Sequence, residues 1–199
     1  MLLRRLTAPT LALALVVTLA ACGSDNSSSA NSAADSSTGS VSAVALNAAD
    51  IEFAQGMIAH HEQAIEMAEI ALDPNVGASP EVVDLATRIK GAQGPEVELM
   101  TGWLTAAGEP VSMGASEGHD MSSMEGMMTA EQMDAMAAMT GTDFDQTWLQ
   151  MMIAHHKGAV SQSQTVKAKG SNADVLALAD TIIKAQQAEI TGMQALLGA

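Results

Sequence analysis

The pattern of apolar and polar positions divides the chain into three parts. In residues 1–21 an apolar run, Leu11–Leu19, follows Arg4 and Arg5, which is typical of an export signal and too short to span a bilayer comfortably. Residues 23–43 are rich in Ser, Ala, Asn and Asp and lack apolar periodicity, so we expect a flexible tether. Residues 44–199 are long enough to bury a single core and form the expected domain.

Capping and turn residues within this domain predict four long helices. The expected limits of these helices are Asp50 to Asp73-Pro74, Ser79-Pro80 to Gly108, Asp143 to Gly170, and Ser171 or Asn172 onward. Gly94-Pro95 should interrupt and kink the second helix. A capping box, Thr129-x-x-Gln132, predicts a short helix over Thr129–Thr140. We therefore expect an all-α, four-helix bundle.

The long helices form two copies of one helix pair, Asp50–Leu104 and Asp145–Leu197. The pentad Met-Ile-Ala-His-His stands unchanged in both copies, at 57–61 and 152–156. Other matched positions are Phe53 with Trp148, Ala64 with Ala159, Gln93-x-x-Glu96 with Gln186-x-x-Glu189, and Met100 with Met193. An insertion, Glu109–Gly141, separates the two copies. The core must be built mainly from aliphatic residues and Met, because the chain has no Tyr, two Phe and two Trp.

The signal ends in Leu-Ala-Ala-Cys, which looks like a bacterial lipobox with Cys22 at the cleavage point. Acylation of this cysteine, the only one in the chain, would leave no thiol for a disulfide or a metal. The alternative is an ordinary secretory signal with a chance cysteine. We expect an exported protein, lipid-anchored at the outer face of the cytoplasmic membrane or in the periplasm or cell envelope, touching the membrane through its anchor only.

The net charge of the mature chain limits the classes of partner that it is expected to bind. From Cys22 onward it keeps six of the eight basic residues and all 23 acidic ones, a formal charge of −17. This charge disfavours nucleic acid and anionic lipid and attracts cations, although solubility explains most of the carboxylates.

Both pentads place sulfur and imidazole on one helix face, because positions i, i+3 and i+4 lie together. Met57, His60 and His61 share such a face, with Met67 further along the same helix. Met152, His155 and His156 repeat it, with Met151 four residues before His155. Antiparallel packing of the two halves could bring both clusters into one core. The alternative is that these histidines only pack, but the pentad persists where neighbouring positions have diverged.

The donor types favour copper over iron. Ferritin-like di-iron sites use Glu-x-x-His, and none of the four helical histidines has Glu three residues earlier. Met57 and Met152 stand where such a site would carry carboxylate for His60 and His155. Thioether with imidazole suits Cu(I) and Ag(I) better than iron or zinc.

The insertion adds a second group of soft donors. Eight of the fifteen methionines lie within it: Met113, Met121, Met124, Met127, Met128, Met133, Met136 and Met139. His119, Met121 and Met124 stand in a Gly- and Ser-rich stretch, where methionine should have little core to fill, and are candidate ligands. Sacrificial oxidation is a competing use. Met133, Met136 and Met139 lie on the predicted short helix, where packing in the core is as good an explanation as metal binding.

Two further repeated pairs could orient the histidines. Gln93 with Glu96, and Gln186 with Glu189, could accept hydrogen bonds from imidazole N–H groups, or could simply join helices. The sequence shows no Ser/His/Asp arrangement, Cys nucleophile, phosphate loop or dinucleotide fingerprint.

The duplicated MIAHH blocks, each followed by a Gln-x-x-Glu and a Met, resemble the bacterial ferritin-like "domain of unknown function 305" family over Asp50–Leu197, apart from the insertion. The resemblance implies an all-α, ferritin-like bundle and export. It also implies copper binding and tolerance, as for some members, through Met57, His60, His61, Met152, His155 and His156.

These observations predict a copper-binding lipoprotein for buffering, sequestration or tolerance, with Cu(I) expected and iron disfavoured. The alternatives are a metal-dependent redox enzyme, which the missing Glu-x-x-His motifs disfavour, and a metal-free scaffold or interaction module. A homo-oligomer and a copper-transfer partner are both left open.

Overall fold

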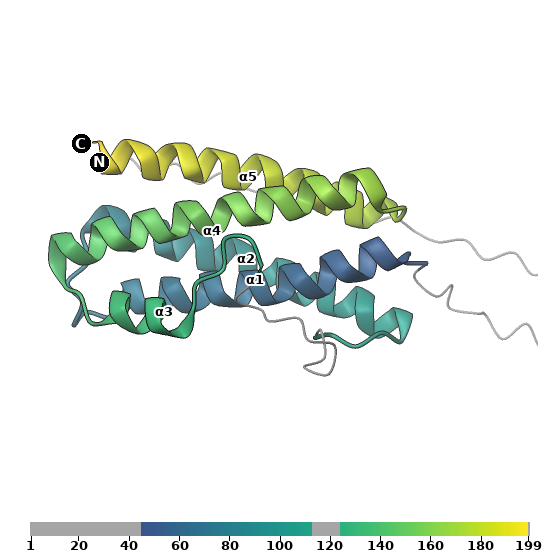
Figure 1. Ribbon diagram of the computed structural model, residues 1–199, viewed down its shortest axis with the longest axis horizontal. Helices are drawn as coiled ribbons and strands as arrows, with labels where there is room; N and C mark the ends of the chain where they lie inside the picture. The colour runs from purple at the N-terminus through teal and green to yellow at the C-terminus, as the bar shows by residue number, and fades with distance from the viewer. Residues whose placement is uncertain (1–44, 113–123, 199) are drawn as a thin grey trace, which may run out of the picture. The chain divides into compact units, whose positions relative to one another are not determined.

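The computed structural model describes residues 45–112 and 124–198 (Figure 1). These residues form five helices and no strand: α1 Ala48–Leu72, α2 Pro80–Ala107, α3 Ala130–Ala137, α4 Gly141–Lys169 and α5 Ala173–Leu197. The expected all-α class is confirmed. None of these helices is both long and apolar enough to cross a membrane. The predicted signal, Cys22 and the tether lie outside the described residues, as do Met113, His119 and Met121.

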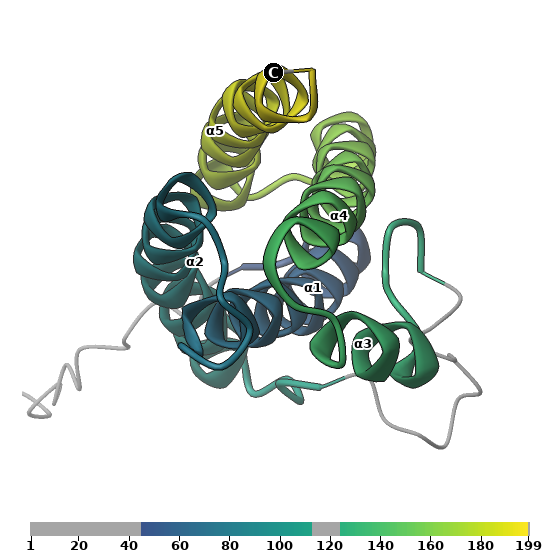
Figure 2. The same cartoon turned by 90° about the vertical axis from the view of Figure 1, so that its left-hand side faces the viewer.

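The four long helices pack lengthwise, as Figure 2 shows nearly end-on. α1 packs on α2, α4 packs on α5, and the two pairs meet where α1 lies against α4. The short helix α3 packs against α4. Each repeat therefore forms one helix pair, and the first helix of each repeat makes the junction between them.

α1 and α4 run antiparallel about a point between His60 and His155. Trp148 Nε1 donates a hydrogen bond of 2.9 Å to the carbonyl oxygen of Met67. Trp148 lies seven residues before His155, and Met67 lies seven residues after His60. This equal spacing is what an antiparallel pair centred on the two histidines requires. The two repeats are thus related by an approximate twofold axis.

Two aspartates join the repeats in a way that follows the same axis. The Asp50 carboxylate on α1 accepts hydrogen bonds from the backbone N–H groups of Ser171 and Asn172, at the start of α5. Its counterpart Asp145 on α4 accepts from the backbone N–H of Ser79, at the start of α2. Each repeat thereby stabilises the N-terminus of the other repeat's second helix, where negative charge is favourable.

Two expected helix starts were wrong. Asn47 caps α1, and Asp50 is its third residue, completing a capping box by accepting from the Asn47 N–H. α4 begins after Thr140, earlier than the expected Asp143, where the Gly141 N–H donates to the Val76 carbonyl. Ser79, Asn172, Thr129 and Gly108 cap helices as expected.

The expected interruption at Gly94-Pro95 does not break α2, which is continuous from Pro80 to Ala107. Proline removes one backbone donor, so the carbonyl four residues earlier, at Gly91, loses its intrahelical partner. The helix continues past the proline while packed on α1.

Two apolar clusters fill the interior on either side of the histidines. Along α1, Phe53–Ile58 belongs to one cluster and Ala64–Ala71 to the other, with His60 and His61 between them. Along α4 the order is reversed, because that helix runs the opposite way. The four histidines therefore form a polar layer inside an aliphatic core.

Candidate metal centre

The centre of this layer is a direct contact between the two repeats. The imidazole rings of His60 and His155 lie 3.8 Å apart between centroids, with an interplanar angle of 47°. All four histidines are completely buried. The sequence left open whether the two pentads meet, and in the structure they do.

The other two histidines are held by carboxylates within their own repeat. His61 Nε2 lies 2.7 Å from Glu96 Oε2, and His156 Nε2 lies 2.8 Å from Glu189 Oε2. A carboxylate accepts hydrogen bonds, so each Nε2 carries a proton and each Nδ1 keeps its lone pair. Of the two predicted pairs of orienting residues, the glutamates therefore reach the histidines.

Among the residues that the structure describes, most of the imidazole nitrogens find no hydrogen-bond partner. Both nitrogens of His60 and of His155, and Nδ1 of His61 and of His156, are buried without one. The Gln93 amide and the Gln186 amide oxygen are buried and unpartnered too. An unpaired polar atom in a protein interior costs about 1–3 kcal/mol, so this layer needs an additional group to satisfy it.

Burial keeps the central pair of imidazoles, His60 and His155, in the neutral form. Burial lowers the pKa of His60 to about 3, and the neighbouring His61 contributes to the same shift. Burial also lowers the pKa of His155 well below its ordinary value, with a further contribution from His60. The Glu125 carbonyl opposes the shift at His60, although its geometry falls short of a hydrogen bond to either ring nitrogen. Neutral imidazole is the form that ligates metals, so both rings are ready to bind without losing a proton.

The donors present suit a soft cation, but their arrangement must change to hold one. Within the described ranges, no three His, Cys, Asp or Glu side chains converge on one metal position. The contact between the rings of His60 and His155 leaves no room for an ion between them. A site that uses three of the four imidazoles therefore requires the rings to rearrange.

The predicted thioether donors lie beside the layer. Met57 is buried in one apolar cluster, whereas Met67 and Met152 are buried in the other. Met151 is partly buried against the same cluster as Met152. Met67 lies about 10 Å along the helix axis from His60, because seven residues separate them at 1.5 Å each. Met57 and Met152, one turn before His60 and His155, are the thioethers nearest in sequence to the central pair.

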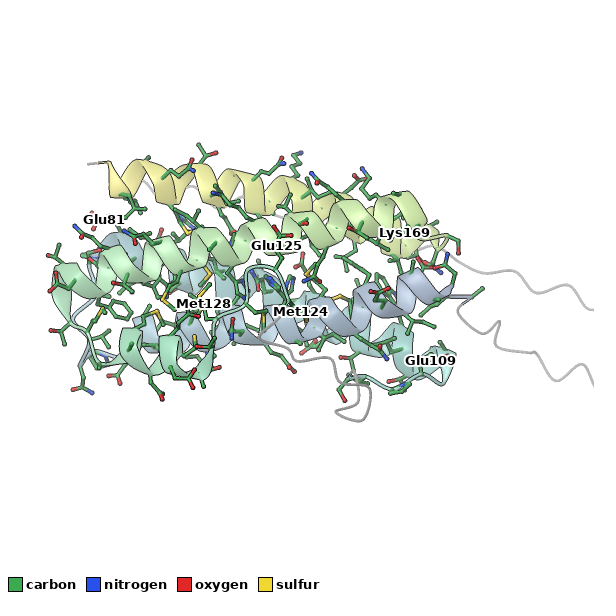
Figure 3. The ribbon with its side chains drawn as sticks, in the orientation of Figure 1. Glu81, Glu109, Met124, Glu125, Met128 and Lys169 are labelled. Carbon is green, nitrogen blue, oxygen red and sulfur yellow. The ribbon has the colours of Figure 1, made fainter. Side chains whose placement is uncertain are left out.

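The described end of the insertion crosses α1 and α4 at the histidines. We call Met124–Met128 the strap; Figure 3 labels Met124, Glu125 and Met128 along it. Gln63 on α1 donates from Nε2 to the Met128 carbonyl at 2.9 Å and accepts from the Met128 N–H at 2.7 Å. On α4, the strap lies so close to Gly158 that a Cβ there would be 1.8 Å from the Glu125 carbonyl oxygen.

The expectation that methionines in this stretch have little core to fill was wrong for Met128. Its side chain is only 9% exposed and packs in the apolar cluster that contains Met67. Met133 and Met136 of α3 are buried in the same cluster, which settles their alternatives in favour of packing. Met124 and Met127 are half-buried on the strap.

Gln63 and Gly158 are residues of this region that were not predicted from the sequence. They occupy equivalent positions in the two repeats, two residues after the pentad, and both hold the strap. The feature of the sequence that could have indicated them is the difference between the two copies at this position, directly beside the unchanged pentad.

Solved structures resemble this chain over most of the domain. A Streptomyces coelicolor structure described as a secreted DUF305 protein is 29% identical, with a TM-score of 0.68, and the match covers 75% of this chain and 92% of that one. A DUF305 fragment from Deinococcus radiodurans is 27% identical, with a TM-score of 0.68 and coverage of 76% and 97%. CopM in its Cu(II)-bound form is 33% identical, with a TM-score of 0.63 and coverage of 75% and 95%. CopM in Cu(I)-bound and Ag-bound forms also matches.

A search of curated proteins gives no match. Residues 50–197 match the family described as a domain of unknown function, DUF305. The matched segment contains both helix pairs, the four buried histidines and their glutamates. The chain therefore belongs to the DUF305 family.

Proposed function

We propose that this protein is an exported, lipid-anchored copper-binding protein that takes up Cu(I) in the histidine layer and buffers or sequesters it. The observation that carries the proposal is the set of six buried imidazole nitrogens without partners, contributed by both repeats. A cation that accepts neutral nitrogen and sulfur donors can bind the lone pairs of these rings without introducing negative charge. The copper- and silver-bound forms of CopM support the same class of cargo.

In this proposal the two repeats close around one shared site. His60 and His155 would supply the central imidazoles, because they already touch across the repeat junction. His61 and His156 would supply Nδ1, because Glu96 and Glu189 occupy their Nε2 atoms. Donation of each Nε2–H to its carboxylate fixes the tautomer and raises the basicity of the ring. Met57, Met152 and Met124 would add thioethers, with Met67, Met151, His119 and Met121 as outlying donors.

The location follows from the N-terminal sequence and one relative. The lipobox-like sequence ending at Cys22 supports export and acylation. The Streptomyces coelicolor relative described as secreted supports export independently. Lipid anchoring would keep a copper buffer at the envelope, where its high negative charge attracts cations.

A competition titration tests the proposal. The mature chain is titrated with Cu(I) against a chromophoric chelator, beside a variant with His60, His155, His61 and His156 changed to Ala. A second variant, Gln187→Ala, changes an exposed position on α5, leaves the layer intact and serves as the control. The wild type and the control should take Cu(I) from the chelator, and the four-histidine variant should lose at least about a hundredfold in affinity. Failure of the wild type to compete, or equal binding by the four-histidine variant, would refute the proposal.

A further inference from the structure

The strap covers the side of the histidine layer that the long helices leave open. In Figure 2 the strap and α3 lie on the side of α1 and α4 that faces away from α2 and α5. His60 and His155 belong to the α1–α4 junction and are nevertheless completely buried. Something other than α2 and α5 must therefore shield them on this side, and the strap is the segment in position.

The contact between the strap and His60 is direct. A Cβ added at Gly158 would meet both the Glu125 carbonyl oxygen, at 1.8 Å, and His60 Nε2, at 3.0 Å. The backbone of the strap therefore lies next to the imidazole, with only the hydrogens of a glycine beside them. Gly126, at φ 86°, also lies against the backbone of α4, because a Cβ there would lie 2.7 Å from the Ala154 carbonyl oxygen.

In the described part of the insertion, contacts on both α1 and α4 fasten the strap, beside the burial of Met128 in the apolar cluster. On α1 the fastening consists of the two hydrogen bonds between Gln63 and the backbone of Met128. On α4 it is close packing at Gly158 and Gly126. The repeats differ at this pair of positions, Gln in one and Gly in the other, as a single strap lying across a twofold axis requires.

We propose that metal reaches and leaves the His60–His155 pair by displacement of the strap, and that Gln63 and Gly158 are the positioning residues that hold the strap closed. This inference rests on the proposed function. The competing route passes Glu96 and Glu189, whose side chains are 19% and 23% exposed. The two routes make different predictions, because only one depends on the residues that seat the strap.

The kinetics of transfer distinguish the routes. Cu(I) transfer to and from a chromophoric chelator is followed by stopped flow for the full mature chain and for Gln63→Ala and Gly158→Ala. Both variants should take up and release Cu(I) about tenfold faster, the factor for loss of about 1.4 kcal/mol of fastening. Because both rates rise together, the equilibrium affinity of Gln63→Ala should change less than threefold. Gly158→Ala is compared by its rates alone, because its Cβ would also lie 3.0 Å from His60 Nε2. Gln55→Ala, which removes a hydrogen bond from α1 to the Pro110 carbonyl, is the matched control for Gln63. Gly192→Ala is the control for Gly158, because its Cβ meets nothing within 4 Å.

A second readout uses the metal-free protein. Diethyl pyrocarbonate acylates neutral imidazole, and peptide mass mapping reports modification of His60 and His155. Gln63→Ala should accelerate this modification, whereas Gln55→Ala should match the wild type. Wild-type rates for both variants in both assays would refute the role of the strap, and faster acylation with unchanged Cu(I) kinetics would refute the route. Absence of Cu(I) binding by the wild type would instead overturn the proposed function.

Discussion

His60 and His155 lie 95 positions apart in the chain, yet their imidazole rings are in contact at a centroid distance of 3.8 Å. They occupy the same position in two copies of one motif, and the antiparallel packing of α1 and α4 brings them into contact. Neither ring has a hydrogen-bond partner. The contact makes the two copies parts of one structural unit at the centre of the core.

One shared site predicts non-additive losses. If both rings bind the same ion, His60→Ala and His155→Ala should each weaken Cu(I) binding by a similar factor, and the double variant should be little worse than either. The histidine layer of each variant should bind either one equivalent of Cu(I) or none. Titration measures this stoichiometry in chains that all keep the methionines of the insertion. Retention of half the bound copper by each single variant would show one independent site per repeat.

Acidification should destabilise the metal-free protein through His60. The pKa of His60 is about 3 in the folded chain and 6.5 without the fold, so the unfolded chain binds more protons between these values. The free energy of unfolding should therefore fall as the pH drops below about 6.5, by up to about 1.4 kcal/mol per pH unit from this residue. Urea unfolding between pH 4 and pH 7 should show a shallower decline for His60→Leu. Parallel curves for the two proteins would contradict the lowered pKa.

Glu96 should act on metal binding through His61. Glu96→Gln replaces the carboxylate that holds Nε2 by a weaker neutral acceptor, so His61 loses basicity and orientation. Affinity for Cu(I) should fall by about 10- to 100-fold, and Glu189→Gln should have a similar effect through His156. The matched control is Glu98→Gln, an exposed position on the same helix. An equal loss in Glu98→Gln would attribute the effect to net charge instead.

The two aspartates that join the repeats should contribute differently to the free energy of unfolding. Asp50 is fully buried and accepts from the backbone N–H groups of Ser171 and Asn172, whereas Asp145 is half-buried and accepts from Ser79 alone. Asp50→Ala should lower the free energy of unfolding by about 3 kcal/mol, and Asp145→Ala by about 1 kcal/mol. Urea unfolding of both variants measures the difference. Equal effects would indicate that the additional partners of Asp50 contribute nothing.

Substitution of two methionines of the strap should distinguish a residue that binds the metal from one that only packs in the core. Met124 is half-buried and lies beside Glu125, whereas Met128 is buried in the apolar cluster. Met124→Leu should weaken Cu(I) binding about tenfold, because leucine keeps the volume but lacks the sulfur donor. Met128→Leu should leave affinity unchanged and alter stability by less than about 1.5 kcal/mol. Competition titration with thermal unfolding checks both, and the reverse order of affinities would exclude Met124 as a ligand.

Much of the local structure could be read from the sequence. The caps at Ser79 and Asn172, the end of α1 before Asp73 and the short helix after Thr129 follow from signals within a few residues. The start of α1 at Asn47 also follows from a local capping box with Asp50, whereas the second role of Asp50, as an acceptor for Ser171 and Asn172, involves a segment more than 120 residues away. Met128 was misread because Gly and Ser neighbours do not reveal the core that it enters.

The sequence by itself determined the helices, the duplication, the unchanged pentad and the soft character of its donors, because helical periodicity sets which side chains share a face. Only the tertiary structure decided that His60 meets His155 while His61 and His156 turn to the glutamates, and that the strap lies across them. Spacing along one helix orients a side chain about that helix axis alone. The relative rotation of α1 and α4, and the path of the insertion, depend on contacts between residues far apart in the chain, such as Trp148 with Met67 and Gln63 with Met128.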